Sequence, residues 1–94
     1  MLNTMIIDAK DNVAVAIEPI QKGDSITYLL NGETKTLTAQ EDITIYHKLA
    51  VRDIPAGTPV IKYGEHIGIA SQNIGTGEHV HEHNVASHRE NLDT

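Results

Sequence analysis

The chain has 94 residues, with 7 Lys and Arg against 13 Asp and Glu and therefore a formal charge of −6. This length suits one domain, and the acidic balance argues against a nucleic-acid-binding surface. The absence of Cys excludes disulfides and thiolate zinc sites. No apolar run approaches the ~20 residues of a membrane span, and the N-terminus lacks the features of a signal peptide. We therefore expect a cytoplasmic protein that binds neither nucleic acid nor membrane.

Short runs of Ile and Val, broken by Gly, Pro, Asn and Asp, predict a mostly β fold. Asn31-Gly32 predicts a two-residue hairpin turn, and Tyr63-Gly64 predicts a second one. A helical turn is allowed at 38–42, because Thr38 can cap a helix and Glu41 follows three residues later. Residues 1–86 are expected to form one domain and 87–94 a polar tail. In chain order, we expect strands at 5–8, 12–18, 25–30, 34–38, 43–46, 48–52, 60–63, 66–71 and 79–84.

The pattern I-x-x-G-x-x-[I/V] occurs three times, beginning at Ile20, Ile54 and Ile74. Each copy follows one expected strand and precedes another. The pattern suits a corner in which an apolar residue anchors the turn and Gly takes an unusual backbone conformation. Two interpretations remain open, namely a true internal repeat and repeated use of the same turn chemistry.

Histidines carry the most informative chemistry, because three of the six lie in GEHVHEHN. On a strand, His79, His81 and His83 would share one face, with Cβ atoms about 6–7 Å apart. Neutral imidazole is a common ligand for Zn, Fe, Cu and Ni, and clustered imidazoles disfavour one another's protonation. The three histidines are therefore candidate metal ligands. The alternative is a polar strand face with no chemical role.

The pair His47-Lys48 lies between two apolar runs, where it could meet an anionic group or end a solvated strand. Lys62 has the same two interpretations, since a Lys within a strand either extends to solvent or pairs with an anion. His66 is expected at the surface and His88 in the polar tail, without a chemical role.

Two segments carry a family resemblance. HKLAVRDIPAGTPVIKYGEHIGIA, from His47, and GEHVHEHN, from Gly77, resemble the small SAF-type domain of the altronate/galactarate dehydratase family. The resemblance implies a compact β-clip fold. In that family the module is part of a long dehydratase or a separate small subunit, as in the alpha subunit of sulfolactate sulfo-lyase.

The resemblance also implies a function. The family eliminates water, or sulfite in the lyase, from 2-hydroxy acids that are often sugar acids. It implies a divalent metal, Fe(II) or Mn(II), with Zn(II) as an alternative, and a large catalytic dehydratase subunit as partner. By resemblance, His47, Lys48 and Asn84 are the expected catalytic residues, and His81, His83 and His79 the expected metal ligands. Lys62 and Glu65 also match the family string.

Competing hypotheses remain at this point. The chain could be a stand-alone metal- or carbohydrate-binding module without catalysis, or, with less support, an ice-binding or chaperone protein of the same fold. A chain of this size supplies a few polar groups rather than an enclosed substrate cavity, which favours a site shared with a partner. Exposed strand edges also allow a homodimer.

Overall fold

The computed structural model describes residues 2–86, in which the chain forms short strands and no helix. This confirms the expected mostly β fold, and no helix in the described part of the chain could span a membrane. The strands are β1 (Thr4–Met5), β2 (Val13–Ala16), β3 (Ser25–Leu30), β4 (Glu33–Thr38), β5 (Lys48–Ala50), β6 (Pro59–Lys62), β7 (Glu65–Ala70), β8 (His79–Val80) and β9 (Val85–Ala86).

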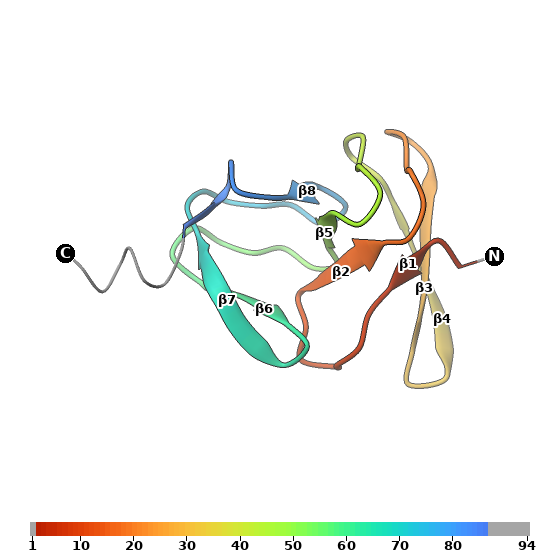
Figure 1. Ribbon diagram of the computed structural model, residues 1–94, viewed down its shortest axis with the longest axis horizontal. Helices are drawn as coiled ribbons and strands as arrows, with labels where there is room; N and C mark the ends of the chain where they lie inside the picture. Colours follow the sequence, from red (N-terminus) through yellow and green to blue (C-terminus); the bar gives the residue numbers. More distant parts are fainter. Residues whose placement is uncertain (1, 87–94) are drawn as a thin grey trace.

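A central antiparallel sheet has the strand order β1-β2-β5-β8. The β3–β4 hairpin lies at one end of the molecule, and the β6–β7 hairpin, extended by β9, lies at the other (Figure 1). Both hairpin turns are confirmed: Asn31 and Gly32 have φ values of 53° and 79°, and Tyr63 and Gly64 have 56° and 77°. Positive φ at both central residues matches the type I′ turn that the strand twist favours.

The central sheet separates two small apolar cores, because side chains alternate between the faces of a strand. Ala14 and Leu49 face the core under the β3–β4 hairpin. Their neighbours Val13 and Ala50 face the core under the β6–β7 hairpin. The first core consists of Ile6, Ala14, Ala16, Ile20, Ile26, Tyr28, Ala39, Ile43 and Leu49. The second consists of Val13, Ala50, Ile54, Val60, Ala70, Ile74 and Val80.

Each of the three sequence patterns forms a corner with Gly at positive φ: Gly23 at 92°, and Gly57 and Gly77 at 87°. A fourth corner runs from Ile43 to Leu49, where Tyr46 takes the Gly position with a φ of 69°. The corners come in two pairs, joined by the isolated bridges Ile20↔Ile43 and Ile54↔Ile74. We call these the first and the second corner pair.

The two corner pairs repeat one another in their backbone hydrogen bonds. Equivalent bonds in the two pairs are, with the donor first, Gly23–Ala39 and Gly57–Ala70, Tyr46–Ala16 and Gly77–Ala50, and Asp24–Gln21 and Thr58–Pro55. Strand β5 follows the first corner pair and precedes the second, so the two repeated segments share it. The geometry therefore favours an internal repeat over independent reuse of a turn.

One expected strand is wrong, and the helical turn that the sequence allowed is absent. Residues 43–46 form no strand, because only Ile43 makes a bridge before the chain turns at Tyr46, whose N–H donates to the Ala16 carbonyl. Residues 38–42 form no helical turn, because Thr38 ends β4 and the Gln40 N–H donates to the Gly77 carbonyl across the molecule. In both places a contact with a distant segment replaces the local structure.

The strand expected at 79–84 is also wrong beyond its second residue. Strand β8 ends at Val80, and residues 82–84 form a turn before β9. The turn is held by Asn84, whose N–H donates to the His81 carbonyl. The other expected strands are present, most of them within one or two residues of their observed ends, whereas β1 and β2 are shorter than expected. The tail at 87–94, including His88, lies outside the described residues.

Candidate functional site

Three histidines meet where β5 and β8 pair. Antiparallel pairing places Leu49 opposite His79 and Lys48 opposite Val80. His47 directly precedes β5, and His81 directly follows β8. The second corner of each pair leads into one of these strands, so the repeated backbone brings together side chains that are more than 30 residues apart in the chain.

The rings of His47, His79 and His81 stack on one another. The ring centroids of His47 and His81 are 4.2 Å apart with planes at 9°, and those of His47 and His79 are 5.1 Å apart at 17°. Nδ1 of His47 lies 2.8 Å from Nε2 of His79, a hydrogen bond whose donor depends on the tautomers. One nitrogen of each of the three rings lies within 4.8 Å of the others, so this cluster could hold a metal ion.

Side-chain contacts hold the backbone of β8, the strand that begins with His79 and leads to His81. A carboxylate oxygen of Glu41 accepts a hydrogen bond of 2.8 Å from the His79 N–H. The Asn84 side chain, only 3% exposed, accepts a hydrogen bond from the His81 N–H and donates one to the His79 carbonyl. Asn84 thus holds both histidine backbones in place, and the sequence pattern alone did not indicate this role.

Electrostatics favour the neutral ring at His79. Burial lowers the pKa of His79 below its usual value, and the neighbouring His47, His83 and His81 lower it further, against an opposing effect of Glu41. A neutral imidazole has a free lone pair, which both a metal ligand and a general base require.

Lys48 and His81 line a shallow cavity of about 300 Å³ together with Ile67, Glu82 and Val85. Lys48 is half-buried, and burial lowers its pKa, with a further lowering from the charge of Lys62. The cavity thus combines an apolar wall with a partly desolvated cation beside the histidine cluster.

The structure therefore gathers His47, His79, His81 and Lys48 in one region. His83 is exposed, and its ring is tilted at 38° to that of His79 with centroids 5.4 Å apart. It lies beside the cluster and outside the group whose nitrogens approach one another. His66 is exposed on β7, as expected. Glu41 is the contact that the sequence did not reveal, because there it suggested only a helix cap.

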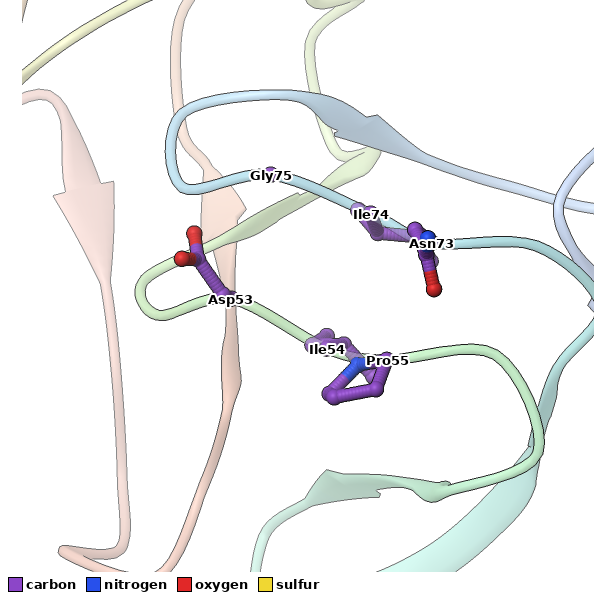
Figure 2. Close-up of a pocket in the computed structure, with 6 residues that line it drawn as sticks. All are labelled: Asp53, Ile54, Pro55, Asn73, Ile74 and Gly75. Carbon is purple, nitrogen blue, oxygen red and sulfur yellow. The ribbon is translucent and has the colours of Figure 1, made fainter.

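A larger cavity, of about 440 Å³, lies away from the histidines, at the second corner pair (Figure 2). It is lined by Asp53, Ile54, Pro55, Asn73, Ile74 and Gly75, which come from two antiparallel segments. Asp53 and Asn73 accept backbone hydrogen bonds from Thr76 and Ala56 respectively. Because these polar groups stabilise the corners themselves, we place the functional site at the histidines despite the smaller cavity there.

Comparison with known proteins identifies the family of the chain. The sequence profile of the altronate/galactarate dehydratase SAF domain matches residues 2–88. The chain belongs to the altronate/galactarate dehydratase SAF-domain family. The resemblance inferred from the sequence is thereby confirmed.

Relatives within the SAF-domain family differ in length. Altronate dehydratase of Escherichia coli (strain K12) is 40% identical over 87 residues, which are 93% of this chain and 17% of that protein. Altronate dehydratase of Bacillus subtilis (strain 168) is 39% identical over 79 residues, or 84% of this chain and 15% of that protein. (2R)-Sulfolactate sulfo-lyase subunit alpha of Chromohalobacter salexigens is 38% identical over 91 residues, or 94% of this chain and 97% of that protein. The chain thus spans less than a fifth of these altronate dehydratases and nearly all of that subunit alpha.

Proposed function

We propose that this chain is the small subunit of a sugar-acid dehydratase of the altronate type, and that it contributes histidines to a metal-dependent β-elimination site shared with a large catalytic subunit. The observation that carries the proposal is the stacked cluster of His47, His79 and His81 in a domain of a dehydratase family. A carbohydrate-binding module without catalysis would not require three histidine nitrogens within 4.8 Å of one another.

The residues of the cluster fit a divalent metal. Two nitrogens that each lie ~2.1 Å from one ion are roughly 3.0–3.4 Å apart, and the observed 2.8 Å between His47 and His79 is close to that spacing. The three nitrogens lie within 4.8 Å of one another, and the stacked rings would rotate to point their in-plane lone pairs at the ion, which would replace the hydrogen bond between His47 and His79. Three imidazoles leave further coordination positions for oxygen ligands, which suits Fe(II) or Mn(II) and also permits Zn(II).

The proposed reaction removes the proton next to the carboxylate of a 2-hydroxy acid and expels the β substituent. A metal bound at the cluster would supply Lewis-acid stabilisation of the developing negative charge. His47, His79 and His81 would hold it, Asn84 and Glu41 would keep their backbone in position, and Lys48 would place a cation beside the substrate. The remaining groups, including those that set the leaving group, would come from the large subunit.

A second candidate is the alpha subunit of a sulfolactate sulfo-lyase. It is favoured by the match over 97% of the subunit alpha of Chromohalobacter salexigens, whereas the altronate dehydratases match over only a small part of their length. Either function uses a separate large chain and the same histidine cluster. A cytoplasmic location and a homodimer remain predictions.

Metal titration of the isolated chain tests the cluster. We expect His47→Ala and His81→Ala to weaken binding of Mn(II) or Zn(II) by about 100-fold or more, since each removes one of three ligands. His83→Ala should change the affinity less than about tenfold, because its ring lies outside the cluster. His66→Ala, an exposed histidine on another strand, is the matched control. Equal metal affinities in wild type, His47→Ala and His81→Ala would contradict the metal site.

Co-expression with a large dehydratase chain tests the activity. The reconstituted pair, supplied with Fe(II) or Mn(II), should eliminate water from altronate or galactarate, or sulfite from sulfolactate. The substrate that turns over decides between the two candidates. Rapid turnover of any of the three by the isolated chain would contradict a shared site.

A further inference from the structure

Lys48 forms no ion pair with an acidic residue in the described part of the chain, although Glu82 lines the same cavity. The Lys48 side chain is half-buried and lines the cavity of about 300 Å³. Within residues 2–86, the only ion pair joins Lys35 and Glu33 on β4, a strand of the separate β3–β4 hairpin. Partial burial of a charge is unfavourable unless it is paired, and an anion bound in the cavity would offset that cost.

Lys62 adds a second positive charge to the same region. Repulsion between the two positive charges contributes, after burial, to the lowered pKa of Lys48. The Lys62 ammonium lies 4.8 Å from the centre of the Tyr63 ring, a cation–π contact that helps to hold it. An anion bound near Lys48 would relieve this repulsion.

The cavity beside Lys48 has the size and lining for a small organic acid. Its volume of about 300 Å³ is at the lower end of the range for ligand sites. Ile67, which is 41% exposed, and Val85 provide an apolar wall, and His81 joins the cavity to the metal cluster. Glu82 also lines the cavity, where its negative charge would weaken the binding of any anion and that of multiply charged anions most.

We propose that Lys48 forms a subsite for the carboxylate of a small 2-hydroxy acid next to the histidine cluster. The identity of the acid as a substrate rests on the proposed function, whereas binding of the carboxylate rests on the unpaired cation and the cavity alone. In this role Lys48 orients the acid by charge and hydrogen bonding and exchanges no proton with it.

Titration of the metal-free chain with L-lactate, followed by NMR of backbone amides, tests the subsite. Lactamide is the matched ligand control, because it has nearly the same shape without the charge. We expect saturable shifts at His81, Glu82 and Val85 with lactate and none with lactamide. Lys48→Met should weaken lactate binding by at least about tenfold, as expected for loss of a hydrogen bond to a charged group.

Two further variants separate charge from other effects. Lys48→Arg retains the charge and should bind lactate within about threefold of wild type. Lys35→Met removes the same charge from the β3–β4 hairpin and should bind lactate as wild type does. Unchanged lactate affinity in Lys48→Met, equal shifts with lactamide, or the absence of saturable lactate binding would each overturn the proposal.

Metal titration of the same variants distinguishes failure of the carboxylate subsite from failure of the proposed metal site. Lys48→Met should bind Mn(II) or Zn(II) as tightly as wild type, because Lys48 is not one of the three converging ligands. Intact metal binding without lactate binding would overturn the subsite alone. Lactate binding without metal binding would overturn the metal site and leave the subsite standing.

Discussion

The two corner pairs have the same backbone but different surroundings. In the first pair, the position of the second Gly is taken by Tyr46, whose side chain is 72% exposed. In the second pair, the same position is Gly77, where an added Cβ would overlap the Thr38 carbonyl oxygen. One corner therefore opens to solvent, while the other is covered by the segment that follows β4.

This difference explains how a repeated fold produces a single site. The covering segment contains Glu41, which holds the backbone of His79, and Gln40, which binds the Gly77 carbonyl. The open corner leads directly into His47 and Lys48. The site lies where the open corner at Tyr46 and the covered corner at Gly77 adjoin. The two corners have matching backbone hydrogen bonds but carry different side chains.

Gly77→Ala is expected to have the largest effect on stability. Its φ of 87° costs a residue with a Cβ roughly 1–2 kcal/mol, and the overlap with Thr38 forces the covering segment to move, which raises the total to about 3 kcal/mol or more. Gly57→Ala is the matched control, because its φ is also 87° but no atom lies within 4 Å of the added Cβ. Urea unfolding of both variants measures the difference. Equal losses would show that the covering segment adapts freely.

The same overlap connects stability to the site. A displaced covering segment would move Glu41 away from the His79 N–H. Gly77→Ala, if folded, should therefore weaken metal binding, whereas Gly57→Ala should not. Wild-type metal affinity in a folded Gly77→Ala protein would mean that Glu41 does not position the cluster.

Tyr46→Gly is expected to stabilise the protein by about 0.5–1 kcal/mol. The substitution removes the cost of positive φ for a residue with a Cβ, which exceeds the added flexibility of Gly in the unfolded chain. Little packing is lost, since the ring is 72% exposed. Tyr46→Ala retains the backbone strain without the ring and should unfold near the wild-type urea concentration. A loss of stability in both variants would show that the Tyr46 ring makes a stabilising contact.

The corners show what the sequence could and could not predict. Three corners were predictable because Gly marks a backbone position that other residues avoid. The fourth was not predictable, because Tyr46 occupies that position and the pattern of residues 43–46 then favours a strand. The internal repeat became clear only from hydrogen bonds between segments distant in the chain, which no local pattern encodes.

The histidines show a different limit. Their alternation predicted one shared strand face, and the structure places His79 and His81 together, but Asn84 turns the chain before His83 can join them. His47 joined the expected site through the family resemblance, since strand pairing rather than spacing brings it to His79. Residue types therefore indicated the chemistry, while the set of converging rings depended on tertiary structure.

The smallest expected effect concerns Asp53. Its side-chain hydrogen bonds in the second corner pair have no counterpart at the equivalent position of the first pair. Its carboxylate accepts hydrogen bonds from the N–H and the hydroxyl of Thr76, and both lower its pKa below the usual value near 3.8. The residue at the equivalent position of the first pair is Pro19, which has no such side chain.

Asp53→Asn should therefore be less stable than wild type at pH 6, and the difference should shrink in acid. A carboxylate with a pKa lowered by folding stabilises the protein above its unfolded-state value, and this contribution is lost as the pH falls through the lower folded-state value. The window thus lies below about pH 4. Thr76→Val removes only the hydroxyl donor, so its pH-dependent loss should be smaller than that of Asp53→Asn. Thermal unfolding from pH 6 to pH 2 measures these differences. A difference between wild type and Asp53→Asn that stays constant over that range would show that the charged form of Asp53 contributes nothing to the second corner pair.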